Sequence, residues 1–232
     1  MNRNTNNSNK IGSGANGVGS NNSAIRTLEV THKPLVILRC KVILIGDACV
    51  GKSALVQVFE SGGANYPKNY LMTVGCEFVV KQVPIPNTNY VVELFLYDCG
   101  GQSIFNQLDM NAKYYEDAAA VMVVYSISSR DSLQSSAKWM TSAKGAISSA
   151  NAPICVLVGN KTDLRDGTID SRAEITFTEG KQFAQGIGCQ HFETSAATNQ
   201  GVDDPFKHIA QEFFKRFEDS ATSFEDFPSR RY

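Results

Sequence analysis

A glycine-rich segment that ends in lysine and serine is the most chemically specific feature of this chain. The segment from Gly46 to Ser53 reads GDACVGKS and fits the pattern G-x-x-x-x-G-K-[ST]. In such a loop, backbone N–H groups line a concavity that binds phosphate, and the following helix adds its positive end. Lys52 would reach the β- and γ-phosphates of a nucleotide, and the Ser53 hydroxyl would bind Mg²⁺. The candidate phosphate-binding residues are Gly46, Ala48, Cys49, Val50, Gly51, Lys52 and Ser53.

A second motif could select the base of that nucleotide. Asn160 and Asp163 lie three residues apart directly after an apolar run. The Asp163 carboxylate can accept hydrogen bonds from both the ring N–H and the exocyclic amine of guanine, a pattern that adenine cannot reproduce. The segment that ends in Ser195 and Ala196 follows the next apolar run and could present backbone N–H groups to the guanine carbonyl oxygen. The candidate base-binding residues are Asn160, Lys161, Asp163, Ser195 and Ala196.

A third motif, Asp98-Cys99-Gly100-Gly101-Gln102, could serve the metal ion and the reaction itself. Asp98 can hold a water molecule bound to Mg²⁺, the Gly101 N–H can meet a γ-phosphate, and Gln102 can orient a hydrolytic water. We therefore assign Gln102 and Lys52 as catalytic candidates. Because no arginine is positioned by sequence to assist, slow intrinsic hydrolysis of GTP is expected. Each motif is weak alone, and their order along the chain makes the set specific.

The elements that must position these motifs follow from the hydrophobic pattern. Short apolar runs alternate with helical stretches, which predicts β–α units around a mostly parallel sheet with helices on both faces. Residues 86–89 form a connection too short for a crossover helix, so the strands on either side are expected to pair antiparallel. Ligands of such sheets bind at the carboxyl ends of the strands. We predict six strands, at residues 37–45, 77–84, 91–97, 119–125, 154–158 and 190–193.

Two helices have apolar stripes that predict packing against the sheet. In the last helix, Asp203 or Asp204 is expected at the N-terminus with Pro205 in the first turn. The helix that contains Trp139 has a similar stripe. The predicted stripes are Phe206, Ile209, Ala210, Phe213 and Phe217 in the last helix, and Leu133, Ala137, Met140, Ala143 and Ile147 in the other.

Composition and charge exclude several classes of protein. The net charge of −1 and the 42% hydrophobic content are typical of a globular domain and argue against a nucleic-acid partner. The apolar runs are far shorter than the roughly 18 residues of a membrane-spanning helix. The six cysteines lack C-x-x-C spacing, so free thiols in a reduced cytoplasmic setting are expected.

The three motifs, taken together, resemble the Ras superfamily of small GTPases over roughly residues 37–217, and within it the Rab branch. The Rab-like signs are Tyr70-x-x-Thr73-x-Gly75-x-Glu77-Phe78 and the pair Tyr114-Tyr115. The resemblance implies the small-GTPase P-loop α/β fold and binding of GTP or GDP with Mg²⁺. It further implies roles for individual residues: Thr73 in binding Mg²⁺ with Ser53 and Asp98, Tyr66 in packing against guanine, Ala54 near the α-phosphate, and Tyr70 beside the nucleotide.

Within this branch, several stretches are similar to the Rab-like GTPase subunits of intraflagellar transport complex B. They include residues 79–86, 92–95 and 158–164 and the dipeptide Pro205-Phe206. This resemblance implies a place in the cilium or flagellum, a small β-sandwich protein and other complex B subunits as partners, and unidentified exchange and activating factors. Two alternatives remain open: an unprenylated Rab-type GTPase of vesicle trafficking, and a structural subunit stabilised by nucleotide with little turnover.

The ends of the chain differ in composition from the region between them. Residues 1–23 contain eight Asn, four Ser and four Gly, which predicts a disordered arm over 1–30. The GTPase domain is expected at 36–217, followed by a tail at 218–232. The last cysteine is Cys189, and Asn2 stands where N-myristoylation requires glycine, so no direct lipid anchor is expected.

Three features depart from the common Rab pattern. A methyl group at Ala48 would approach both the hydrolytic water and an incoming arginine, which would slow assisted hydrolysis. Cys49 stands where glycine is usual, so either the backbone is strained by about 1 kcal/mol or the loop adjusts. Cys99-Gly100 and Ser103 alter the residues around Gln102, so the partner surface of that segment is expected to differ.

Overall fold

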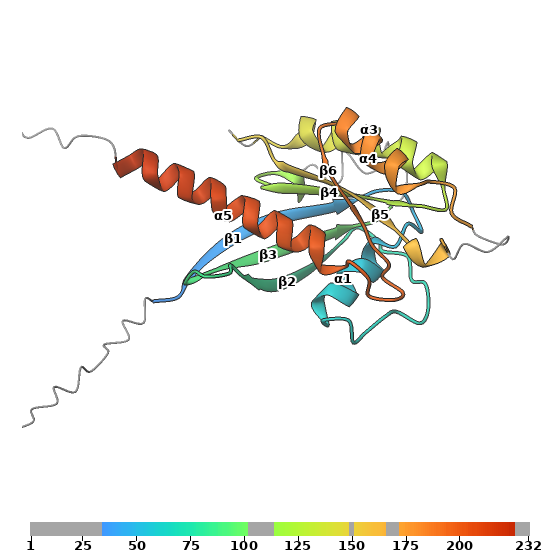
Figure 1. Ribbon diagram of the computed structural model, residues 1–232, viewed down its shortest axis with the longest axis horizontal. Coiled ribbons are helices and arrows are strands. Elements are labelled where there is room, and N and C mark those ends of the chain that lie inside the picture. Colours follow the sequence, from blue (N-terminus) through green and yellow to red (C-terminus); the bar gives the residue numbers. More distant parts are fainter. Residues whose placement is uncertain (1–33, 102–113, 149–150, 166–171, 226–232) are drawn as a thin grey trace, which may run out of the picture. The chain divides into compact units, whose positions relative to one another are not determined.

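A twisted six-stranded sheet forms the framework of the protein (Figure 1). The structure is a computed structural model, and it describes residues 34–101, 114–148, 151–165 and 172–225. The strand order is β2-β3-β1-β4-β5-β6, with β2 antiparallel to β3 and all other neighbours parallel. The strands are β1 (Val36–Ile45), β2 (Cys76–Pro84), β3 (Tyr90–Cys99), β4 (Ala120–Ser126), β5 (Ile154–Asn160) and β6 (Gln190–Glu193).

Helices cover both faces of this sheet, as the sequence predicted (Figure 1). One face packs against α1 and α5, and the other packs against α3 and α4. The helices are α1 (Lys52–Glu60), α3 (Arg130–Ala146), α4 (Phe177–Gly186) and α5 (Asp203–Glu225), with a short 3-10 helix η1 at Thr162–Leu164.

The strands agree with the predicted ranges to within two residues at each end. Every residue of β4 is buried, because this strand lies inside the sheet with helices on both sides. The strand β3 extends to Cys99, two residues beyond the predicted end, because Cys99 pairs with Cys76 on β2. Likewise β5 extends to Asn160, which pairs with Ser126. These extensions place Asp98 and Asn160 at the carboxyl ends of strands.

The connection between β2 and β3 is a tight hairpin, which confirms the antiparallel pairing. The Ile85 amide donates to the Tyr90 carbonyl at 3.0 Å and closes the turn. Inside it, the Thr88 hydroxyl donates to the Ile85 carbonyl at 2.8 Å, and Asn87 adopts a φ of 61°. Asparagine tolerates that conformation better than most residues, so the local sequence selects this turn.

The helix α5 differs from its predicted form in two ways. Its buried stripe includes Phe214, whereas Phe213 is half-buried and Phe217 is 38% exposed with its ring beside Tyr90. The stripe turns in this direction because Phe214 also packs on the Tyr90 ring, with centroids 4.9 Å apart. Phe206, Ile209 and Ala210 are buried as predicted.

The helix α5 also continues eight residues past the predicted end at 217. Residues 218–222 are exposed, and the hydroxyls of Ser220 and Thr222 donate to the carbonyls of Arg216 and Glu218. The helix was predicted to end at 217 because the apolar stripe stops there. The backbone hydrogen bonds of an exposed helix do not require such a stripe, so the helix continues. The proposed tail at 218–232 is therefore helical to Glu225, and its remainder lies outside the described residues.

The helix α3 buries Leu133, Met140 and Ala143 as predicted, together with Trp139. Ala137 and Ile147 are only half-buried, and Ile147 caps the end of the helix with an extended ψ of 115°. The buried face of α3 thus also includes Trp139, which the predicted stripe did not contain.

Some predictions concern parts of the chain outside the described residues. They are the arm at 1–30, Gln102 and Ser103. Within the ranges that the structure describes, no helix combines the length and apolar composition that crossing a membrane requires.

Candidate functional site

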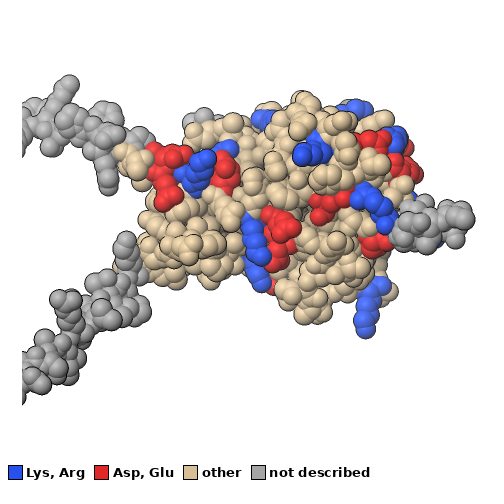
Figure 2. Space-filling model, in the orientation of Figure 1, with Lys and Arg blue, Asp and Glu red and all other residues tan. Residues whose placement is uncertain are grey.

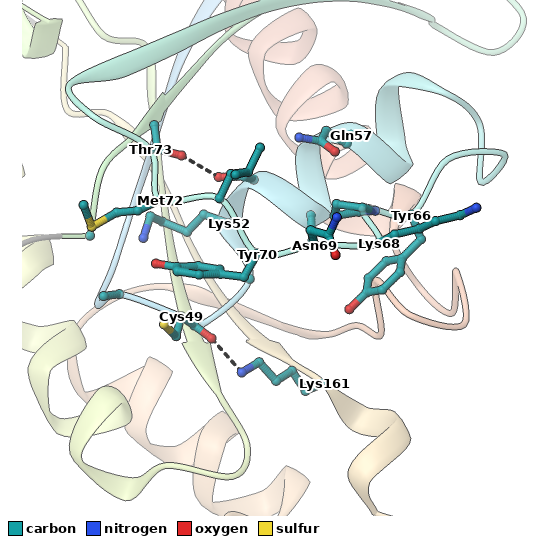
Figure 3. A pocket seen from close by; sticks show the side chains of 17 residues that line it. Cys49, Lys52, Gln57, Tyr66, Lys68, Asn69, Tyr70, Met72, Thr73 and Lys161 are labelled. Atoms are coloured by element: carbon teal, nitrogen blue, oxygen red, sulfur yellow. Dashed lines mark hydrogen bonds between the residues drawn. The ribbon is translucent and has the colours of Figure 1, made fainter.

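A pocket of about 540 Å³ lies between the Gly46–Ser53 loop and the segment 66–73 (Figure 3). The loop follows β1 and leads into α1, so the pocket opens at the carboxyl edge of the sheet, where the sequence placed it. The candidate site residues that line it are Ala48, Cys49, Gly51, Lys52, Ser53, Ala54, Tyr66, Tyr70, Thr73, Gly101 and Lys161. Six further lining residues were not predicted: Gln57, Pro67, Lys68, Asn69, Leu71 and Met72.

The backbone of the Gly46–Ser53 loop adopts conformations that favour glycine. Gly46 has a φ of 137°, and a Cβ there would lie 2.1 Å from the Val124 carbonyl oxygen, so no side chain fits. Cys49 has a φ of 63°, in the left-handed region. Of the two possibilities for Cys49, the structure therefore shows the strained backbone rather than an adjusted loop.

This strain predicts that glycine at position 49 stabilises the protein. We expect Cys49→Gly to raise the free energy of unfolding by about 0.5–1 kcal/mol, since relief of the left-handed conformation exceeds the added chain entropy of glycine. Urea denaturation measures this change. The matched control is Ala48→Gly, which lowers stability because the φ of Ala48 is not positive. Equal losses in both variants would contradict the assignment of strain.

Lys52 is held at the centre of the loop. Its side chain is buried, and its Nζ donates to the carbonyls of Gly46 and Asp47, each at 2.9 Å. Burial lowers the pKa of the Lys52 ammonium group because removal from water disfavours its charged form. The nearby Asp98 carboxylate opposes this shift. The ammonium group is thus positioned beside the pocket by the loop's own carbonyls.

Three oxygen-bearing side chains converge next to Lys52. The Ser53 hydroxyl donates to Asp98 Oδ2 at 2.5 Å and lies 2.9 Å from the Thr73 hydroxyl oxygen. Asp98 Oδ1 is buried and has no hydrogen-bond partner among the described residues. Burial raises the pKa of the Asp98 carboxyl, and the Ser53 hydrogen bond and Lys52 charge oppose this effect.

These donors fit a magnesium ion. Mg²⁺ prefers hard oxygen ligands and keeps several waters, and the two hydroxyls and one carboxylate provide such oxygens. A buried carboxylate oxygen without a partner carries a desolvation cost that a cation or its bound water would offset. The predicted metal-binding residues Ser53, Thr73 and Asp98 are therefore brought together, although Asp98 itself does not line the pocket.

Gly101 brings the third motif against the Gly46–Ser53 loop. A Cβ on Gly101 would lie 2.6 Å from the Ala48 amide nitrogen and from the Asp47 carbonyl. Only glycine allows this approach, so Gly101 lines the pocket, and contact of its N–H with a γ-phosphate stays a prediction. Gln102, the next residue, lies outside the described residues, and its catalytic role stays a prediction.

Asn160 joins the two halves of the site. Its side-chain amide donates to the Val50 carbonyl at 3.0 Å, and its Oδ1 accepts from the Thr194 hydroxyl and the Ala196 amide, each at 3.2 Å. Asn160 is therefore buried as a bridge between the phosphate loop and the segment around Ser195. The backbone amide of Ala196 donates to Asn160 in this structure. Contact of that amide with a guanine oxygen therefore stays a prediction.

The remaining base-binding candidates lie close to this bridge. The Ser195 hydroxyl donates to Asp163 Oδ1 at 2.5 Å and accepts from the Thr198 amide at 3.1 Å, so Asp163 has a defined orientation. Lys161 reaches across to the Cys49 carbonyl, with Nζ and O 2.6 Å apart (Figure 3). Gly46, Val50, Asp98, Asn160, Asp163, Ser195 and Ala196 are the predicted residues that do not line the pocket in this structure.

The aromatic candidates border the pocket from the segment 66–73. Tyr70 is 66% exposed, and its ring lies beside Lys52 and Cys49 (Figure 3). A side-chain hydrogen bond with Cys49 raises the pKa of the Tyr70 phenol. Tyr66 is 52% exposed at the other end of the pocket. Packing of Tyr66 against guanine stays a prediction.

A tryptophan on α3 positions the loop, and the sequence analysis assigned it no role. Trp139 Nε1 donates to Asp47 Oδ1 at 2.7 Å across 92 residues of sequence. The Trp139 ring is buried, so this bond anchors the loop to the helix. In the sequence, this contact could be anticipated only from the indole N–H, which usually has a hydrogen-bond partner when tryptophan is buried.

The surface of the described part of the chain carries charges of both signs. On the face shown in Figure 2, basic and acidic residues alternate over the surface without a large area of one sign. Among the ion pairs, Arg165 binds Glu193 with two hydrogen bonds of 2.7 and 2.9 Å and joins the ends of η1 and β6. This arrangement agrees with the near-zero net charge of the chain.

Comparison with known proteins agrees with this geometry. The model of the Ras family matches residues 41–215. An intraflagellar transport protein 27 homolog of Bos taurus is 36% identical over 191 residues, which is 82% of this chain and 98% of that protein. Intraflagellar transport protein 27 of Chlamydomonas reinhardtii is 36% identical over 199 residues, 84% of this chain and 95% of its own.

A Rab protein is similar over a smaller share of the chain. Ras-related protein Rab-17 of Homo sapiens is 34% identical over 176 residues, covering 76% of this chain and 77% of that protein. The region that the family model matches includes the described motifs of the pocket and, apart from the first five residues of β1, the sheet that carries them. This chain therefore belongs to the Ras family and is a Rab-like small GTPase.

Proposed function

We propose that the protein is a guanine-nucleotide switch that binds GTP or GDP with Mg²⁺ in this pocket. The convergence of Ser53, Thr73 and Asp98 beside the buried Lys52 carries the proposal. Lys52 neutralises phosphate charge, and the loop amides bind phosphate oxygens. Mg²⁺ supplies further neutralisation of the phosphates when bound. Asp163, oriented by Ser195, selects guanine over adenine.

Calorimetry with GTP, GDP and ATP tests this assignment. We expect binding of both guanine nucleotides in the presence of Mg²⁺, weaker binding after chelation with EDTA, and no comparable binding of ATP. The buried Asp98 oxygen predicts the chelator effect, because its desolvation cost returns when the metal is removed. Equal affinity for GTP and ATP would exclude the guanine assignment.

Slow hydrolysis of GTP is part of the same proposal. We expect Gln102→Leu to reduce single-turnover hydrolysis while leaving GTP affinity unchanged, because the side chain serves to orient water rather than to bind nucleotide. Quench-flow or filter assays with radiolabelled GTP measure both quantities. The control is Gln82→Leu, a glutamine on β2 that donates to Glu93 and does not line the pocket. Unchanged hydrolysis in Gln102→Leu would remove the catalytic assignment.

We further propose that the protein acts in intraflagellar transport as a subunit of complex B in a cilium or flagellum. The support is 36% identity to two proteins named intraflagellar transport protein 27 or its homolog. The alignments span 98% of the length of one and 95% of the length of the other. The alignment with the Rab protein reported above spans 77% of that protein's length. A small β-sandwich subunit is the proposed direct partner, and exchange and activating factors would regulate the nucleotide state.

Affinity purification of the full chain from native cell extract tests this role. Co-purification with transport-complex subunits supports it, whereas recovery mainly with endomembranes and without those subunits supports a vesicle-trafficking role. Comparison of partner affinity in GDP and in a nonhydrolysable GTP analogue distinguishes a switch from a structural subunit, because a ligand shifts an equilibrium only through differential affinity. Equal partner affinity in both states favours the structural subunit, which Ala48 and the strained Cys49 also favour.

A further inference from the structure

Two thiols face each other at the end of the β2–β3 hairpin. Cys76 begins β2, Cys99 ends β3, and the strand register pairs them directly. The Cys99 thiol donates to Cys76, with the two sulfur atoms 3.7 Å apart. Both are free thiols. None of the roles assigned above uses this pair.

The backbone at this point has the geometry of a disulfide site. The Gly100 amide donates to the Gly75 carbonyl at 2.8 Å, which marks these residues as a hydrogen-bonded pair. Because antiparallel pairs alternate, Cys76 and Cys99 form a non-hydrogen-bonded pair, with Cα atoms about 4.5 Å apart. Disulfides span Cα separations of about 4.4–6.8 Å. Rotation of the side chains is therefore enough to bring the sulfur atoms to bonding distance.

The two thiols differ in access to solvent. Cys99 is completely buried, whereas Cys76 is only half-buried. Their side chains lie on the sheet face that packs against Tyr115, opposite to the face on which Asp98 meets Ser53. A reagent in solution can thus reach the Cys76 sulfur first, and the Cys99 sulfur lies close enough to react with a modified Cys76.

We propose that Cys76 and Cys99 form a peroxide-sensitive site that closes to an intramolecular disulfide. The Cys76 sulfur attacks hydrogen peroxide, so an S–O bond forms, the O–O bond breaks and water leaves. The Cys99 sulfur then attacks the sulfenic sulfur, so the S–S bond forms, the S–O bond breaks and a second water leaves. Two thiols and one peroxide yield one disulfide and two waters, and a dithiol reductant reverses the reaction.

The cross-link would connect the two segments that carry metal-binding side chains. Thr73 lies three residues before Cys76, and Asp98 directly precedes Cys99. A covalent bond here opposes separation of the strand ends, so the oxidised protein releases bound GDP more slowly than the reduced protein. This consequence, unlike the disulfide itself, rests on the proposed nucleotide-binding function.

Peptide mapping after peroxide treatment of the full chain tests the site directly. We expect a peptide cross-linked through Cys76 and Cys99, two hydrogens lighter than the sum of its parts, that separates on reduction with dithiothreitol. In Cys99→Ser, a sulfenic acid accumulates at Cys76 and reacts with dimedone. In Cys76→Ser, the buried Cys99 stays unmodified. Modification of Cys99 but not Cys76 in the wild type, or no cross-linked peptide, overturns the proposal.

A second pair of neighbouring thiols supplies the matched control. A hydrogen bond with Cys189 lowers the pKa of the Cys155 thiol to about 7, so this pair can also react with peroxide. The double variant Cys155→Ser/Cys189→Ser must still form the Cys76–Cys99 cross-link. Its loss in that variant, or cross-linking of Cys155 to Cys189 alone in the wild type, contradicts the proposed site.

Release of fluorescent GDP from oxidised and reduced protein tests the consequence. We expect slower release after oxidation, recovery after reduction, and no effect of peroxide on release in Cys99→Ser. Unchanged release from fully cross-linked protein overturns the proposed regulation. A chain that forms the cross-link but binds no guanine nucleotide instead overturns the proposed function, so the two failures are distinguishable.

Discussion

We expect Lys52→Met to lower the affinity for GTP by roughly 30- to 5,000-fold, which corresponds to about 2–5 kcal/mol for loss of one partner from a buried charge pair. The Lys52 ammonium group is buried and already held by two loop carbonyls, so it meets the phosphates at little entropic cost. Methionine retains the length of the side chain but has no charge. Calorimetry with GTP and Mg²⁺ measures the loss.

Lys161→Met is the matched control for this variant. Lys161 also donates to a carbonyl of the same loop, that of Cys49, but it is only half-buried. We therefore expect a loss of about tenfold or less, as for an ordinary hydrogen bond. Circular dichroism and thermal melting verify that both variants fold. Wild-type affinity in folded Lys52→Met would show that the pocket does not bind phosphate through Lys52.

The second large effect is a change of base preference in Asp163→Asn. We expect affinity for GTP to fall on the order of 10²–10⁴-fold, because two hydrogen bonds to a charged acceptor, each worth about 1.5–3 kcal/mol, are weakened or lost. The amide donates where the carboxylate accepted, so xanthine nucleotides, which carry a carbonyl in place of the exocyclic amine, bind better than in the wild type. Competition of XTP and GTP for a fluorescent nucleotide measures the switch.

Ser195→Ala separates orientation from recognition. Its hydroxyl donates to Asp163 Oδ1 and accepts from the Thr198 amide, so the variant loosens the carboxylate without changing its chemistry. We expect weaker binding of GTP by about tenfold or less and no gain for XTP. A gain of XTP binding in Ser195→Ala, or none in Asp163→Asn, would contradict the assignment of Asp163 to the base.

The predictions that depend on local sequence were the most accurate. The strand ends agree within two residues, because alternation and runs of apolar residues reflect burial directly. The antiparallel pairing of β2 and β3 followed from a connection that is too short for a crossover. In α5, the wrong phenylalanine was assigned to the stripe, because Phe213 and Phe214 both fit helical spacing and only the position of Tyr90 distinguishes them.

The amino-acid sequence by itself determined the order of the elements and the phosphate-binding loop, because both are encoded within short segments whose spacing has one physical interpretation. Only the tertiary structure decided how distant segments meet. Trp139 reaches Asp47, Thr73 reaches Ser53, and Cys76 lies against Cys99. These contacts depend on the strand order and register of the sheet, which bring segments that are distant in sequence together. The loops involved have no periodic pattern, so the sequence of either segment alone does not indicate its partner.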